Sequence, residues 1–132
     1  MSEKQVNEDD VIIFPILRGE SVGEAKQHTG RVVIVRTPDE LQREWGADDI
    51  AVLDSDLEKH FIQNPRDLEL LFSNVSVVLA EFGEAIGDFA AAAYAGEAIG
   101  VVKVRDATHV LEDDMRIRVV TSENIGDVFF ID

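Results

Sequence analysis

Carboxylates and glycines alternate in one short segment of the sequence, and this segment has the clearest potential for chemistry. Gly83, Glu84, Gly87 and Asp88 stand directly before an alanine-rich run. A carboxylate can accept a phosphoryl group, or it can bind Mg²⁺ together with other oxygen ligands. Glycines allow the backbone to approach an anion closely. We therefore take these four residues as the candidate ligand-binding residues, with Asp88 as the candidate acceptor.

Asp88 also has simpler interpretations. Its side chain could cap a helix N-terminus, which contributes roughly 1 kcal/mol. Together with Glu81 and Glu84 it could form a cluster of oxygen ligands for Mg²⁺ or Ca²⁺ or, more simply in so acidic a chain, a solvated acidic rim. It could also bind a ligand without chemistry. Phosphorylation of Asp88 would need Mg²⁺ and a nearby cation. We therefore expect Mg²⁺ only if Asp88 is phosphorylated, and we assign no other cofactor, no resident metal and no definite catalytic residue.

The elements around this segment can be predicted from hydrophobic patterning. A strand is predicted over residues 75–80, and a helix is predicted to start at Asp88 and end at Ala95 before Gly96. Further strands are predicted over residues 11–14, 31–36, 50–53, 99–104, 115–120 and 128–131. A short helix is predicted over residues 38–45, and two more around Asn64-Pro65, because proline interrupts a helix.

The composition indicates one acidic domain. The chain has 132 residues, with 12 Lys and Arg against 27 Asp and Glu, for a net charge of −15. We expect residues 1–10 to form a flexible acidic leader and residues 11–132 a single domain. The charge would repel phosphate backbones and anionic lipids, so neither nucleic acid nor a membrane is an expected partner. The acidic excess fits either a halophilic source or an acidic mesophilic protein.

The expected compartment is the cytoplasm. No apolar run approaches the ~20 residues that span a bilayer. The sequence contains no Cys, which is compatible with a reducing compartment.

Several of these segments together resemble a known family. The run from Glu81 to Ala93, followed by Val101-Val102, resembles the phosphohistidine swivelling (mobile) domain of phosphoenolpyruvate-utilising enzymes. The resemblance spans residues 19–131 in order and also takes in residues 30–35, 49–52 and 113–119. It implies an α/β fold of the swivelling β/β/α type, with mixed sheets and short packed helices.

The same resemblance implies a degenerate site. Asp88 stands where the family carries its phospho-accepting His, Gly87 where it carries Ser or Thr, and Glu84 where it carries a second Gly. The resemblance therefore implies a stand-alone relative of the mobile domain that has no catalytic activity of its own. Such a relative would bind a partner protein or a small ligand. The alternative is a phosphotransferase component that uses Asp88, or the small subunit of a split enzyme beside a larger chain.

Overall fold

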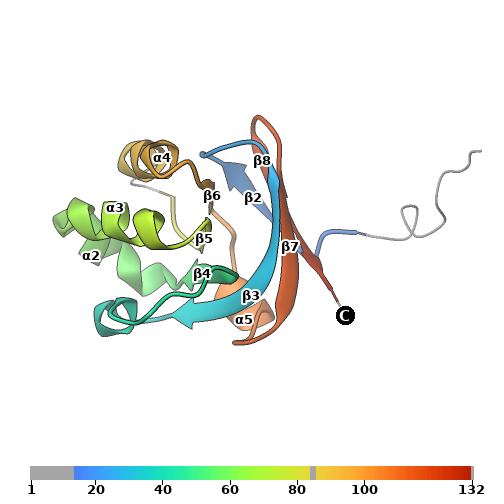
Figure 1. Cartoon of the computed structure of the whole chain (residues 1–132), viewed down its shortest axis with the longest axis horizontal. Helices are drawn as coiled ribbons and strands as arrows, with labels where there is room; N and C mark the ends of the chain where they lie inside the picture. Colours follow the sequence, from blue (N-terminus) through green and yellow to red (C-terminus); the bar gives the residue numbers. More distant parts are fainter. Residues whose placement is uncertain (1–13, 84–85, 132) are drawn as a thin grey trace, which may run out of the picture.

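Seven β-strands form a closed barrel in the computed structural model, which describes residues 14–83 and 86–131, with the backbone alone at 86–88. The strands follow one another around the barrel in the order β2-β6-β5-β4-β3-β7-β8 (Figure 1). Their bounds are β2 (Leu17–Ser21), β3 (Gln27–Val35), β4 (Asp49–Leu53), β5 (Val77–Ala80), β6 (Ile99–Val102), β7 (Arg116–Thr121) and β8 (Ile125–Phe130).

The barrel combines a parallel half and an antiparallel half. Strands β3, β4, β5 and β6 run parallel to one another. Strand β2 pairs antiparallel with both β6 and β8, and β7 pairs antiparallel with both β3 and β8. Parallel neighbours require crossover connections, which is why every described helix except α5 lies between β3 and β6 in the sequence.

All the helices except α5 lie on the side of the parallel half. They are the 3₁₀ helices η1 (Pro38–Leu41) and η2 (Ser55–Leu57) and the α-helices α2 (Glu58–Gln63), α3 (Pro65–Asn74), α4 (Ile86–Ala95) and α5 (Ala107–Val110). In Figure 1, α2, α3 and α4 lie on the side of the barrel opposite β7 and β8. Among the described helices, none combines the length and the apolar character needed to cross a bilayer.

Two apolar cores result from this arrangement. The first fills the barrel and takes one side chain or more from every strand: Leu17, Val32, Val52, Leu79, Val101, Val119 and Val128. Ala107 and Leu111, within and just after α5, join this core. The second core lies between the helices and the outer faces of β3, β4, β5 and β6, and includes Phe61, Phe72 and Phe89. The parallel strands are therefore buried on both faces.

Most predicted elements are confirmed. Strands occur within or overlapping residues 31–36, 50–53, 75–80, 99–104, 115–120 and 128–131. Helices α2 and α3 meet at Asn64-Pro65 as predicted. The helix predicted over residues 38–45 is only the 3₁₀ helix η1, and the predicted strand over 11–14 falls almost entirely outside the described residues.

The predicted fold class, a swivelling β/β/α domain of mixed sheets with short packed helices, is wrong. The strand pairing is mixed, but a single closed barrel takes the place of separate sheets. The sequence analysis missed β2, whose residues Leu17–Ser21 include Arg18, Gly19 and Glu20 and read as a loop. Because β2 pairs with β6 on one side and with β8 on the other, it closes the ring.

A buried carboxylate anchors the amino ends of the parallel strands. Asp49 is 1% exposed. Its Oδ2 accepts a hydrogen bond from the Gly46 N–H at 2.8 Å, and its Oδ1 lies 3.2 Å from Arg31 Nη2. Burial by itself raises the pKa of Asp49, but the Gly46 hydrogen bond, the Arg31 hydrogen bond and the charges of Arg31 and Arg43 together hold that pKa below its usual value.

The Asp49→Asn variant tests this anchor through its pH dependence. A depressed folded-state pKa means that ionised Asp49 stabilises the fold fully above its usual pKa of 3.8, and that this contribution is lost as the pH falls through the lower folded-state value. Urea unfolding at a series of pH values should therefore show the largest difference between wild type and variant at neutral pH. The difference should shrink as the pH falls below 3.8. A pH-independent difference would contradict the assignment.

The Gly126→Ala variant tests how tightly the barrel closes. A Cβ at Gly126 would lie 2.6 Å from Val101 Cγ2, inside the barrel, so the core would have to shift. We expect a loss of about 1–3 kcal/mol in the free energy of unfolding, measured in urea. Gly46→Ala is the matched control, because its Cβ would come no closer than 3.4 Å to a neighbouring atom. Equal losses in the two variants would rule out a tightly packed interior at Gly126.

Candidate functional site

The carboxyl ends of the four parallel strands meet at one edge of the barrel. In parallel α/β sheets this edge is where ligands usually bind, because the loops that leave the strands converge there. Here those loops begin at Arg36 after β3, Asp54 after β4, Glu81 after β5 and Lys103 after β6. We call this group of loop residues, with Gly83 and Thr108, the carboxyl-end site.

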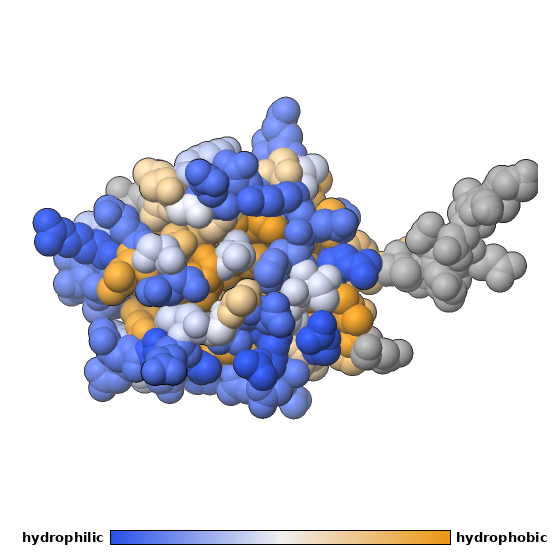
Figure 2. Space-filling model, viewed as in Figure 1, coloured by the Kyte–Doolittle hydropathy of each residue, from blue (hydrophilic) through white to orange (hydrophobic). Residues whose placement is uncertain are grey.

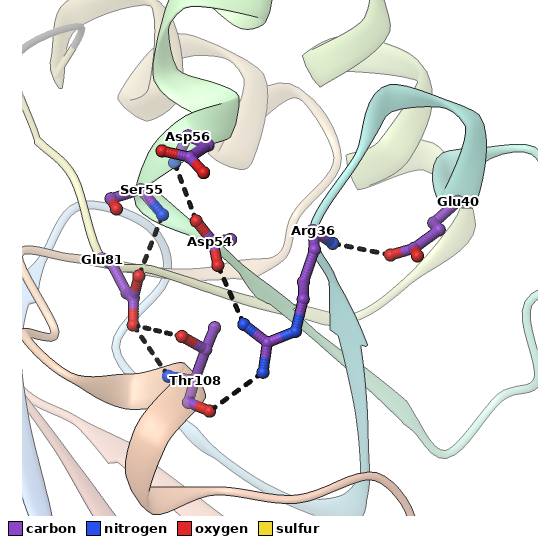
Figure 3. Close-up of polar contacts among 7 residues, drawn as sticks. All are labelled: Arg36, Glu40, Asp54, Ser55, Asp56, Glu81 and Thr108. Atoms are coloured by element: carbon purple, nitrogen blue, oxygen red, sulfur yellow. Dashed lines mark hydrogen bonds and ion pairs between the residues drawn. The ribbon is translucent and has the colours of Figure 1, made fainter.

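Glu81 ties three parts of this site together (Figure 3). Its Oε1 accepts a hydrogen bond from the Ser55 N–H at 2.9 Å. Its Oε2 accepts hydrogen bonds from both the backbone N–H and the hydroxyl of Thr108, each at 2.8 Å. One carboxylate therefore joins the loop after β5 to the starts of η2 and α5, with both oxygens occupied.

Arg36 and Asp54 form the neighbouring part of the site. Arg36 Nη1 lies 3.0 Å from Asp54 Oδ2, and Arg36 Nη2 donates to the Thr108 carbonyl at 3.3 Å. The other oxygen of Asp54 accepts from the Asp56 N–H at 2.9 Å and so caps η2. The Arg36 N–H donates to Glu40 Oε1 at 2.7 Å. These contacts hold the loops in fixed positions relative to one another.

The loop after β6 contains two residues in the left-handed backbone conformation. Lys103 has φ of 59° and Asp106 has φ of 63°. Non-glycine residues adopt this conformation at a cost in energy, and such strain is found most often near functional sites. Lys103 lies directly over the buried Gly83, where a Cβ would come within 2.5 Å of Lys103 Cγ. The Lys103 ammonium lies 3.4 Å from Glu20 Oε2.

A shallow hollow of about 420 Å³ opens beside Arg36 and Thr108. It is also lined by Glu40, His109, Glu112 and Asp113, so half of its six polar side chains are acidic. The described residues contain no group of three or more His, Asp or Glu side chains arranged to hold a metal ion. The geometry of the site is suited to positioning loops, since the Glu81 and Asp54 carboxylates are already engaged.

The predicted ligand-binding residues are placed only in part. Gly83 lies in the site, against Lys103. Glu84 lies outside the described residues. The backbone of Gly87 and Asp88 belongs to α4, which begins at Ile86, so Asp88 is in the first turn of the helix and does not precede it. The side chain of Asp88 lies outside the described part of the chain, and its role as an acceptor or ligand stays a prediction.

Sequence reasoning named Glu81 only as part of an acidic rim or of a metal-ligand cluster. It missed Arg36, Asp54 and Thr108. The signal that could have found Arg36 and Asp54 is positional. Asp54 and Glu81 directly follow the strands predicted over residues 50–53 and 75–80, and Arg36 is the last residue of the strand predicted over 31–36. Polar residues directly after parallel strands share one edge of the sheet. No local pattern marks Thr108, which is 27 residues from Glu81 in the sequence.

The Glu81→Gln variant tests the role of this carboxylate. In the variant, an NH₂ group replaces one of the two Glu81 oxygens that now accept hydrogen bonds. Because NH₂ is a donor, at least one N–H or O–H that donates to Glu81 loses its acceptor. We expect a loss of about 1–3 kcal/mol in the free energy of unfolding, measured in urea. Glu40→Gln is the control, since the single hydrogen bond from the Arg36 N–H can be kept by a glutamine oxygen. If both variants were equally stable, Glu81 would not organise the site.

Comparison with known proteins finds solved structures with a similar fold, among them the following two. One chain of aconitase X (holo-form) from Thermococcus kodakaraensis superposes with a TM-score of 0.54 at 17% sequence identity, covering 86% of this chain and 97% of that chain. The solution structure of a UPF0107 protein superposes with a TM-score of 0.59 at 13% identity, covering 92% of this chain and 100% of that one. No protein-family model matches the sequence, and no curated protein does.

These comparisons correct the resemblance drawn from the sequence. The similar structures are an aconitase X chain and a UPF0107 protein, so the assignment to the phosphohistidine mobile domain of phosphoenolpyruvate-utilising enzymes is wrong. The motif that suggested it, a glycine-containing loop between a buried strand and an alanine-rich helix, is a general feature of strand–loop–helix units. At these identities the likeness establishes the fold.

Proposed function

We propose that this chain is the small subunit of an enzyme divided between two chains, of the aconitase X type. The observation that carries the proposal is the extent of the structural match. Almost the whole of the aconitase X chain, 97%, corresponds to 86% of this chain. The similar chain is thus about the size of this one, and it belongs to an enzyme. The proposal includes a larger partner chain, and it places the assembly in the cytoplasm.

The carboxyl-end site supports a positioning role in such an assembly. The Glu81 carboxylate accepts three hydrogen bonds, and the Asp54 carboxylate is shared between Arg36 and the Asp56 N–H. Engaged carboxylates of this kind hold loops in place and are poorly available as general bases. In this proposal, the subunit supplies a rigid edge of the active site, and the larger chain supplies the groups that react.

Copurification and reconstitution test the proposal. Tagged full-length chain, purified from extract of its source, should retain a larger chain that mass spectrometry identifies as similar to the remainder of aconitase X. The two purified chains, mixed at equal concentration, should dehydrate a hydroxy acid. The reaction can be measured by the ultraviolet absorbance of the unsaturated product.

Each chain assayed alone is the control, and activity should fall at least tenfold when this chain is omitted. The proposal would be overturned if the larger chain were fully active alone. It would also be overturned if the tagged chain copurified with no enzyme subunit.

A further inference from the structure

One half of the barrel has an outer face that no described helix covers. The helix-side core takes its strand residues from β3, β4, β5 and β6 and none from β2, β7 or β8, within the described residues. Figure 1 shows α2, α3 and α4 on the other side of the barrel from β7 and β8. Strand side chains alternate, so every second residue of the bare strands points outward. We call the outward residues Arg18, Arg116, Arg118 and Phe129 of these strands, together with Thr29 and Arg31 in the half of β3 that pairs with β7, the arginine wall.

The bare strands do not share the acidic excess of the whole chain. The outward faces of β2, β7 and β8 carry three arginines, Arg18, Arg116 and Arg118, against two carboxylates, Glu20 and Asp127. Arg31 of β3 is the fourth arginine of the wall. Because the complete chain has a net charge of −15, this face is less acidic than the chain as a whole.

The four arginines of the wall differ in their contacts with carboxylates. Arg18 Nε lies 2.6 Å from Asp127 Oδ1, and Arg31 contacts Asp49 at 3.2 Å and Asp114 at 3.8 Å. Arg116 stands directly opposite Arg31 in the β3–β7 ladder, and like charges in this position repel each other. Among the described residues, no carboxylate pairs with Arg116 or with Arg118. Arg118 donates to the Thr29 hydroxyl at 3.4 Å.

Apolar side chains accompany Arg116 and Arg118. Phe129 lies opposite Arg118 in the β7–β8 ladder. Just before β2, Ile16 is 40% exposed and Phe14 is 75% exposed. In the space-filling view, hydrophobic patches show among hydrophilic residues toward the edge formed by β7 and β8 (Figure 2). Aromatic residues and arginine are enriched at protein interfaces, whereas lysine is depleted, and the wall contains no lysine.

From these observations we infer that the arginine wall is the surface by which this chain docks onto its partner, and that the partner presents a carboxylate-rich surface there. Arg116 and Arg118 would pair with those carboxylates, and Phe129 would be buried between them. A symmetric dimer through this wall is disfavoured, because it would place arginines against arginines. The identity of the partner rests on the proposed function. The location of the docking surface rests on the residues of the wall.

Site-specific photo-crosslinking of the full-length chain tests the inference. The photoreactive residue p-benzoylphenylalanine would replace Phe129 on the wall or, as the matched aromatic control, Tyr94, which is 57% exposed on α4. After irradiation in extract of the source, the Phe129 variant should give one discrete heavier product, and the Tyr94 variant should not. Mass spectrometry should place the crosslink in an Asp- and Glu-rich surface segment of the partner.

Charge reversal provides the second arm. Adding Arg116→Glu and Arg118→Glu to the Phe129 variant should reduce the crosslinked product at least tenfold. Adding Lys59→Glu and Arg66→Glu instead, an equal change of charge on the exposed surfaces of α2 and α3, should leave the yield within twofold.

The outcomes separate this inference from the proposed function. A wall crosslink to an aconitase X-like chain supports both, whereas a wall crosslink to another acidic protein supports the inference and overturns the proposed function. An aconitase X-like chain that crosslinks only from position 94 supports the proposed function and overturns the inference. The inference is also overturned by a product with the mass of two copies of this chain, by the absence of any product from position 129, or by a yield unaffected at Arg116 and Arg118.

Discussion

The four parallel strands carry apolar side chains on both faces, and the architecture follows from the need to bury both. Val52 and Leu79 point into the barrel, while the neighbouring Leu53 and Ala80 point toward the helices. A flat sheet with helices on one side would leave the first set in water. At about 25 cal/mol for each Å² of apolar surface, the loss would be large compared with the stability of a small domain. Closing the sheet into a barrel buries that face without a second helix layer.

The same constraint explains why the two halves of the molecule differ. Crossover helices between β3 and β6 necessarily lie outside the barrel, so they cover the parallel strands. The antiparallel strands are joined without long crossovers, and their outward residues alternate with buried ones, as in β7, where Arg116 and Arg118 flank the buried Ile117. One half of the chain therefore becomes a rigid, double-layered support for loops, and the other half presents a single strand layer outward.

An element of this fold can be predicted from the sequence when the contacts that determine it lie close by along the chain. The strands over 31–36 and 50–53 were predictable because their apolar, β-branched residues form uninterrupted runs, and the break at Asn64-Pro65 was predictable because proline acts locally. Closure was not predictable, because β2 owes its strand conformation to ladder partners such as Val128 and Val102, more than 80 residues away. At the site, Glu81 was visible as an acid, but its partners Ser55 and Thr108 come from other loops.

The ladder between β2 and β8 has a consequence for how the protein is made. Leu17 pairs with Val128, so the first described strand cannot find this partner until synthesis has passed residue 128. Contacts of such long sequence separation slow folding, because a large loop must close before they form. Until β2, β7 and β8 have paired, one edge of β3 and one edge of β6 have no strand beside them. The net charge of −15 opposes edge-to-edge aggregation of the chain during that time.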